Sequence, residues 1–317
     1  MRKLCCLIVL SVAAVCAALA ASGLAAGSPT SQATTPAASA VTSLVTRATV
    51  QNAASASGFA VHSHGARLLP HSASPATRAA ATATAAPRTA SSGLTAAASS
   101  PLLANFNGTS SRDSAVTNFN QEFEPPDQGL CAGNGFVVDM VNSAYTVYKP
   151  NGSVVTGPFN INGPFGEGLT QFTSDPRCYY DPTTNTWFAT ILFISGGDFA
   201  PFGNTSHLDI AVNSPNGPTP NGNPGDPTNP WIVYQFDTTD AGGNGCPCFG
   251  DQPRIGVDSQ NVYVTSDEFS ITGNQFNGGQ IDAFSKKDLV ALSATVHHVH
   301  FAHLSVGGTV PLAPSPR

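Results

Sequence analysis

Beyond about residue 103 the chain consists of short apolar runs, some alternating with polar residues and some continuous. The runs are rich in β-branched and aromatic residues, and Gly, Pro, Asn and Asp separate them, as is typical of strands joined by turns. No stretch keeps an apolar stripe with a helical period, so we expect very little helix. The predicted strands cover residues 136–142, 144–150, 186–194, 208–215, 231–238, 254–258, 261–269 and 279–285.

Three segments of the chain repeat the same order of features, beginning at Asp127, Asp175 and Asp251. In each, a Gly or Pro follows the Asp within two residues, and then come a short strand, a turn, an apolar strand and a second hairpin. Recurring units of about four strands are the signature of β-propeller blades. We therefore predict an all-β fold, a partial β-propeller of about three four-stranded blades. A β-sandwich whose hairpins resemble each other by chance is the alternative.

Two of these repeats also resemble a known group of proteins. Residues 175–190, DPRCYYDPTTNTWFAT, and residues 250–269, GDQPRIGVDSQNVYVTSDEF, are similar to blades of secreted bacterial β-propeller proteins that are distantly sialidase-like. The resemblance covers about residues 105–304 and implies a fold class. It does not imply sialidase activity, because the turn before Trp187 lacks the Gly of the sialidase Asp-box. Since propellers usually close with four to eight blades, the domain is expected to be incomplete: either the chain is truncated, or a partner covers the open edges, or the fold is a sandwich.

The N-terminal part has a different composition. Residues 1–26 begin with a basic Met1-Arg2-Lys3 segment, continue with an apolar run and end with small residues, which predicts a secretory signal peptide. Residues 27–102 are rich in Ala, Ser, Thr and Pro and predict a disordered linker, because they offer too little apolar surface to offset the entropy of ordering. Residues 103–317 are the predicted propeller-like domain. The protein is expected to be secreted or attached to the cell surface or cell wall, with no stable membrane span after signal removal.

Composition narrows the possible partners. Charged residues make up 10% of the chain and the net charge is −6, which argues against nucleic-acid binding. No P-loop, dinucleotide fingerprint, nucleophile elbow or metalloprotease motif is present, so we expect no cofactor and do not favour an enzyme. A glycan, peptide or protein ligand remains possible.

Four cysteines lie outside the predicted signal peptide, and an even number in an exported chain favours disulfides. Cys131 and Cys178 occupy corresponding places in neighbouring repeats, so a Cys131–Cys178 bond between blades is the preferred pairing. Cys246 and Cys248 would then form a small local ring. The exchanged pairings stay open, because four cysteines allow three connectivities.

The charged residues that open the repeats are the candidates for chemistry. Asp175, Asp251 and Tyr180 are candidates for acid, base or nucleophile, and Arg177 and Arg254 are candidates for holding a ligand, since arginine binds carboxylates bidentately. They are predicted to lie just before or at the start of the innermost strands, at one mouth of the propeller. The structural alternative is a network in which these residues cap backbone groups and join the blades.

His298 and His300 share one face of a predicted strand, a spacing that suits a divalent metal such as Zn or Cu. No carboxylate is evident nearby in the sequence, so a histidine-rich edge strand without metal is the preferred interpretation.

The sequence thus favours an extracellular or cell-surface binding or scaffold protein of unknown ligand. A carbohydrate-active enzyme, a glycoside hydrolase or lyase with Asp, Arg and Tyr at the propeller mouth, is one alternative. A non-functional fragment of a longer propeller protein is the other.

Overall fold

The computed structural model describes residues 40–46, 67–68, 102–196, 200–226, 228–241 and 245–304. Within these ranges strands dominate, and the helices α1 (Ser111–Thr117), α2 (Asn162–Phe165) and α3 (Lys286–Val290) are short. None of the helices described is long and apolar enough to cross a membrane. The predicted signal peptide, residues 1–26, lies outside the described residues.

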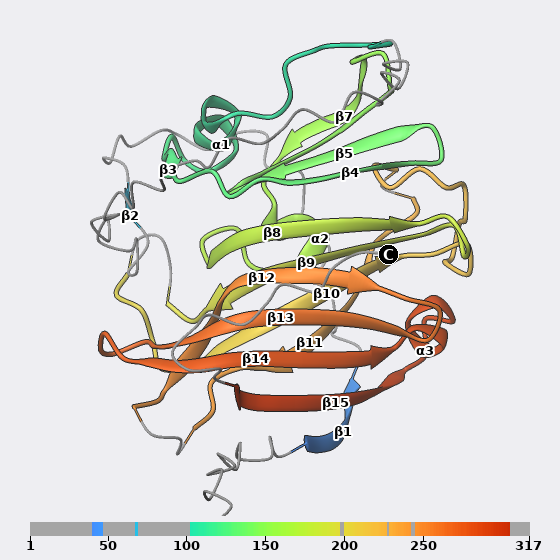
Figure 1. Ribbon diagram of the computed structural model, residues 1–317. Helices are drawn as coiled ribbons and strands as arrows, with labels where there is room; N and C mark the ends of the chain where they lie inside the picture. The colour runs from blue at the N-terminus through green and yellow to red at the C-terminus, as the bar shows by residue number, and fades with distance from the viewer. Residues whose placement is uncertain are drawn as a thin grey trace, which may run out of the picture. The chain divides into compact units, whose positions relative to one another are not determined.

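Three antiparallel sheets, each contributing four consecutive strands, form the main part of the structure (Figure 1). The first contains β4 (Gly129–Gly133), β5 (Phe136–Val141), β6 (Ala144–Tyr148) and β7 (Val154–Phe159). The second contains β8 (Phe172–Asp181), β9 (Thr186–Ile194), β10 (Ser206–Asn213) and β11 (Ile232–Asp237). The third contains β12 (Cys248–Val257), β13 (Asn261–Ser270), β14 (Phe276–Ser285) and β15 (Thr295–Leu304). The predicted all-β fold of three four-stranded, blade-like sheets is confirmed.

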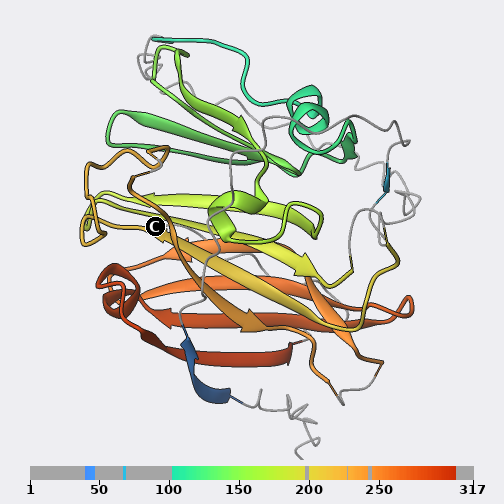
Figure 2. The same cartoon turned by 180° about the vertical axis from the view of Figure 1, so that it is seen from behind.

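The first strands of successive sheets lie against each other, β4 beside β8 and β8 beside β12. The view from behind shows the same stacking of the sheets, with α2 lying against β10 (Figure 2). Within each of these three sets of four, every strand is bonded to its sequence neighbour, so each set is a simple meander. This arrangement brings the starts of the three repeats together along one line of inner strands.

The middle sheet is apolar on both faces because it has a neighbouring sheet on each side. Along β10, Leu208 and Ile210 belong to the core shared with the third sheet, whereas Ala211 belongs to the core shared with the first. In β9, Trp187 and Phe188 divide in the same way. A strand buried on both faces reads as a continuous apolar run rather than an alternating one. Each large side chain buried here contributes roughly 1.5–3 kcal/mol.

Two strands lie within residues 27–102, the predicted linker. β1 (Ala40–Thr46) pairs with β15 along its full length, and β2 (Arg67–Leu68) pairs with β3 (Phe123–Glu124). Val45 of β1 is buried in the core shared by the second and third sheets. An exposed edge strand readily binds another strand, and β1 fulfils this role for β15. The amino-acid composition could not reveal β1, because its pairing with the distant strand β15 depends on the tertiary structure.

Candidate functional site

One residue at or just before each inner strand has a left-handed backbone: Asp127 (φ 46°), Asp175 (φ 59°) and Gln252 (φ 47°). In β8 and β12 this residue lies in a β-bulge, where the register of pairing with the next strand shifts. The sequence placed Asp175 and Asp251 before or at the start of the inner strands; in the structure they lie within β8 and β12. A bulge interrupts the pairing without ending the strand, and it turns the local side chains in a new direction.

The residues around these three left-handed positions form what we call the inner corner, and hydrogen bonds within it join all three sheets. The buried carboxylate of Asp175 accepts hydrogen bonds from the N–H of Gln252 (3.1 Å) and from its side-chain amide (3.3 Å). The N–H of Asp175 donates to Oδ1 of Asn142, in the β5–β6 turn, at 2.8 Å. Arg177 donates to the carbonyl oxygen of Asp127 (2.9 Å) and to Oε1 of Gln252 (3.2 Å). This corner is a structural junction between blades, in which each bond contributes about 1 kcal/mol.

Asp175 is not an accessible catalytic group. Its relative exposure is 0%, so it cannot touch a substrate in this structure. Burial, together with the negative charges of Asp251 and Asp127, raises the pKa of Asp175 well above its usual range. The structure does bring the predicted pair Asp175 and Asp251 together, but Asp175 is occupied by bonds to the neighbouring sheets.

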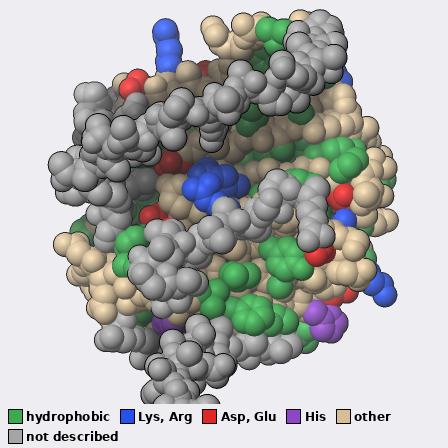
Figure 3. Space-filling model, in the orientation of Figure 1, with side chains coloured by type: hydrophobic (Ala, Val, Ile, Leu, Met, Phe, Trp, Pro, Cys, Tyr) green, Lys and Arg blue, Asp and Glu red, His purple; other side chains and the backbone are tan. Residues whose placement is uncertain are grey.

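The accessible part of this corner consists of Asp251, Asp267 and Arg254. Asp251 lies directly opposite Asp267 in the β12–β13 pairing, and neither is fully buried. Burial, then the charge of Asp251, raises the pKa of Asp267 to about 6, while Arg254 opposes this shift. Arg254 is exposed and makes no ion pair within 4 Å to any residue that the structure describes. Lys or Arg side chains gather at the centre of this face, at the level of β8 and β12, with acidic ones beside them (Figure 3).

Tyr180 does not belong to this corner, which corrects the prediction. Five positions separate it from Asp175 along β8, roughly 16 Å at the rise of an extended strand. Its hydroxyl donates to Oδ1 of Asn185 (2.9 Å) in the β8–β9 turn, and its ring lies 4.6 Å from that of Trp187.

A cavity of about 260 Å³ lies at the end of the inner strands away from the inner corner, beside the β4–β5 and β8–β9 turns. None of its lining residues is titratable. Two prolines border it, and the polar lining comes from turns and from the loop after β10: Asn134, Asn185, Asn213, Ser214, Asn221 and Gly222. The sequence analysis missed this site; its signal was the asparagine that recurs in the turn of each inner hairpin.

Both disulfides have the preferred pairing. Cys131 of β4 is bonded to Cys178 of β8, with Cα atoms 5.7 Å apart, so the bond joins the first two sheets. Cys246 and Cys248 are bonded to each other at the start of β12. Two disulfides fit a protein that folds in an oxidising, extracytoplasmic environment.

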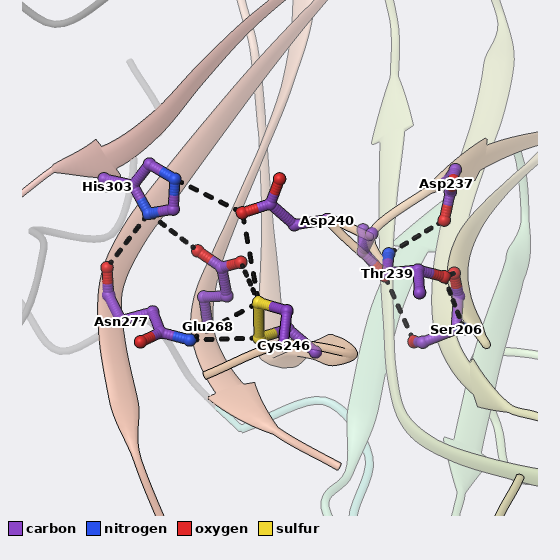
Figure 4. Close-up of a disulfide and its surroundings, with 10 residues drawn as sticks. Ser206, Asp237, Thr239, Asp240, Cys246, Glu268, Asn277 and His303 are labelled. Atoms are coloured by element: carbon purple, nitrogen blue, oxygen red, sulfur yellow. Dashed lines mark hydrogen bonds and ion pairs between the residues drawn. A yellow bond between two sulfur atoms is a disulfide. The ribbon is translucent and has the colours of Figure 1, made fainter. Parts of the chain in front are cut away.

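Polar side chains from the consecutive strands β13, β14 and β15 lie around the Cys246–Cys248 disulfide (Figure 4). Asn277 of β14 donates to the sulfur of Cys248 at 3.0 Å. Oε1 of Glu268, on β13, lies 3.5 Å from the sulfur of Cys246. The sequence offered no way to bring these residues together.

His298 and His300 share a face, as predicted, but the expected lack of a nearby carboxylate is wrong. Oδ1 of Asp282, on β14, lies 2.7 Å from Nε2 of His298 and 2.7 Å from Nδ1 of His300. Burial alone would lower the pKa of His300, but the hydrogen bond and charge of Asp282 raise it. Nδ1 of His298 lies 2.9 Å from the hydroxyl of Ser43 on β1. The three side chains could ligate one divalent ion, and they equally form a hydrogen-bonded network between strands.

A further cluster escaped the sequence analysis. Nε2 of His207 lies 3.1 Å from Glu167 and 3.5 Å from the buried Asp209. Burial, then the charge of Glu167, raises the pKa of Asp209 well above its usual range. A His-x-Asp spacing places both side chains on one face of a strand, and this was the available signal. One imidazole and two carboxylates could also hold a divalent ion.

No protein-family model matches the chain, and no curated protein matches it. Among solved structures it is similar to an exo-β-1,3-galactanase from Phanerochaete chrysosporium, solved with galactose. The identity is 8% and the TM-score 0.27, over 52% of this chain and 44% of that one. A luciferin-regenerating enzyme shows 12% identity and a TM-score of 0.22, over 59% of this chain and 80% of that one. The chain spans less than half of the galactanase, and both TM-scores are too low to bear on function.

Proposed function

We propose that this chain is an exported binding protein that holds an uncharged glycan in the asparagine-lined cavity, without catalysing a reaction. The observation that carries the proposal is the chemistry of the lining, which offers amide and hydroxyl groups and no titratable side chain. General acid–base catalysis needs a group that can exchange a proton, so this cavity supports binding alone. The two disulfides support export.

Amide side chains match a ligand rich in hydroxyl groups, because each amide both donates and accepts. Asn134 donates to the carbonyl oxygen of Gly222 at 3.1 Å, and Asn185 accepts from Tyr180. The remaining Oδ1 of Asn134 and Nδ2 of Asn185 make no hydrogen bond to the residues that the structure describes. These two atoms are therefore available to a ligand. The volume of the cavity is near the lower end of the range for ligand sites and suits one sugar residue of a longer chain.

Binding of neutral oligosaccharides on an array, followed by calorimetry with the best of them, tests the proposal. Asn185→Ala and Asn134→Ala are expected to weaken binding by about tenfold each, the loss of roughly 1–1.5 kcal/mol of hydrogen bonding. Asn151→Ala is the matched control, because Asn151 lies exposed in a turn outside the cavity lining and bonds only within that turn. Equal affinity of all four proteins for the same glycan would contradict the assignment of the site.

One observation favours hydrolysis as a second candidate function. Asp267, with its pKa of about 6, lies opposite Asp251. A carboxyl group with a raised pKa can act as the general acid while a second carboxyl group acts as base or nucleophile in cleaving a glycosidic bond. Mass spectrometry of glycans incubated with the wild-type protein and with Asp267→Asn separates the two functions. Products that require Asp267 indicate hydrolysis at the inner corner, and recovery of intact glycan supports binding.

A further inference from the structure

The Cys246–Pro247–Cys248 segment presents one accessible and one inaccessible sulfur. Cys248 has a relative exposure of 0%, whereas Cys246 is half-buried. In thiol–disulfide exchange the incoming thiolate must reach one sulfur while the other leaves. The structure therefore determines the direction of attack, with Cys246 as the sulfur that is attacked and Cys248 as the leaving group.

The leaving sulfur has a hydrogen-bond donor. Nδ2 of Asn277 lies 3.0 Å from the sulfur of Cys248 and 3.5 Å from that of Cys246. A thiolate is stabilised by donors that point at it, and it is the thiolate that must form when the disulfide opens. The other disulfide is different, because Cys131 and Cys178 pack against the apolar core between the first and second sheets.

A buried acid lies beside the attacked sulfur. Glu268 has a relative exposure of 0%, and its Oε1 lies 3.5 Å from the sulfur of Cys246. Burial, then repulsion from Asp240, raises the pKa of Glu268 to about 7, while His303 opposes the shift. A carboxyl group with this pKa can both accept and return a proton near neutral pH.

A chain of polar groups connects this acid to solvent (Figure 4). His303, on β15, lies 3.4 Å from Oε2 of Glu268 and 3.2 Å from Oδ2 of Asp240. About half of the His303 side chain is exposed, so the proton on Glu268 can exchange with water. The titratable groups that face Glu268 are Asp240, His303 and, next along β15, His300, which feels the charge of Glu268.

We propose that Cys246 and Cys248 form a redox-active centre that exchanges disulfides with dithiols of other polypeptides, with Glu268 as proton carrier and Asn277 as donor to the leaving thiolate. In the first step the proton of a substrate thiol passes to the buried carboxylate of Glu268 through the half-exposed His303, which lies 3.4 Å from it. The thiolate then attacks Cys246, the Cys246–Cys248 bond breaks, and the sulfur of Cys248 leaves as a thiolate.

In the second step the other substrate thiol attacks the substrate sulfur of the mixed disulfide. The thiolate of Cys246 leaves and receives the proton from Glu268, and the proton of the second thiol passes to Cys248 through solvent. The substrate is oxidised to a disulfide and the protein is reduced to a dithiol, with no proton gained or lost. Reoxidation by another disulfide is the reverse of the same exchange, so it needs no further oxidant.

The test uses the full chain and a peptide dithiol whose fluorescence changes on oxidation. The wild-type protein should oxidise one equivalent, at a rate that rises with pH around an inflection near 7. Glu268→Gln should slow the reaction near pH 7 by about 100-fold or more and remove this inflection, as expected for the loss of a general base. Cys246→Ser with Cys248→Ser should abolish it. The matched control, Cys131→Ser with Cys178→Ser, should keep it.

A second measurement needs no variant. Wild-type protein is treated with increasing dithiothreitol, alkylated and analysed by mass spectrometry, so that each cysteine pair reports its own reduction. Cys246 and Cys248 should be labelled at lower dithiothreitol than Cys131 and Cys178. Labelling in the opposite order, or a rate in Glu268→Gln equal to that of wild type across the pH range, would overturn the proposal.

Discussion

Replacing Asp267 with Asn is expected to stabilise the protein above pH 6 and to leave its stability near pH 4 unchanged. The folded-state pKa of Asp267 is about 6, raised from 3.8 by burial and by Asp251. Between these two pH values the unfolded chain has lost this proton while the folded protein still holds it. The free energy of unfolding of the wild type therefore falls as pH rises through this window. Asn has nearly the same shape and no charge, so the variant escapes this loss.

The magnitude follows from the displacement of the pKa. A difference of about two pH units corresponds to roughly 3 kcal/mol at 1.36 kcal/mol per unit. Asp267 is only about half buried, so solvent screens its charge and the figure must be reduced. At pH 4 the free energy of unfolding of the variant should equal that of wild type. At pH 7.5 we expect it to be higher than that of wild type by about 1–2 kcal/mol.

Urea unfolding at pH 4.0 and 7.5, followed by tryptophan fluorescence, measures this change. Asp258→Asn is the control of opposite sign. Hydrogen bonds from the N–H groups of Asn261 and Gln260 lower the pKa of Asp258, so its carboxylate stabilises the fold above the unfolded pKa and loses this effect as pH falls. If Asp267→Asn differs from wild type by the same amount at both pH values, the raised pKa of Asp267, assigned to burial and to the charge of Asp251, is refuted.

Two further changes test the packing of the first two sheets. The double variant Cys131→Ser with Cys178→Ser opens a loop with a sequence separation of 47, which should lower the free energy of unfolding by about 4 kcal/mol, as a lower melting temperature in calorimetry would show. Gly133→Ala should lower the free energy of unfolding by about 1–3 kcal/mol in the same assay, because the added Cβ would clash with the ring of Tyr180. At Gly135 an added Cβ would meet no other atom within 4 Å, but the residue has a φ of +76°. Gly135→Ala should therefore lower the free energy of unfolding by only about 1 kcal/mol. An equal loss in both variants would exclude the steric explanation.

Local pattern was sufficient for the three repeats, because strands, turns and their order depend on neighbouring residues. The apolar run of β9, which contains Trp187 and Phe188, indicated a strand, and the structure buries that strand on both faces. The Cys131–Cys178 bond could also be predicted, since corresponding positions of successive repeats lie side by side. Local pattern failed for β1, whose partner β15 lies at the other end of the chain. No composition rule detects a strand that is ordered only by a distant edge.

The sequence by itself therefore determined the all-β architecture and its three four-stranded repeats, and it favoured the cysteine pairing that the structure has. Only the tertiary structure decided which charged groups are accessible, because burial and proximity are properties of the folded chain. It buried Asp175 in a junction between blades and left Asp267 facing Asp251 near the surface. It also placed Glu268 of β13 and Asn277 of β14 against the Cys246–Cys248 disulfide. The register between antiparallel strands sets these distances, and that register depends on which side chains the neighbouring sheets bury.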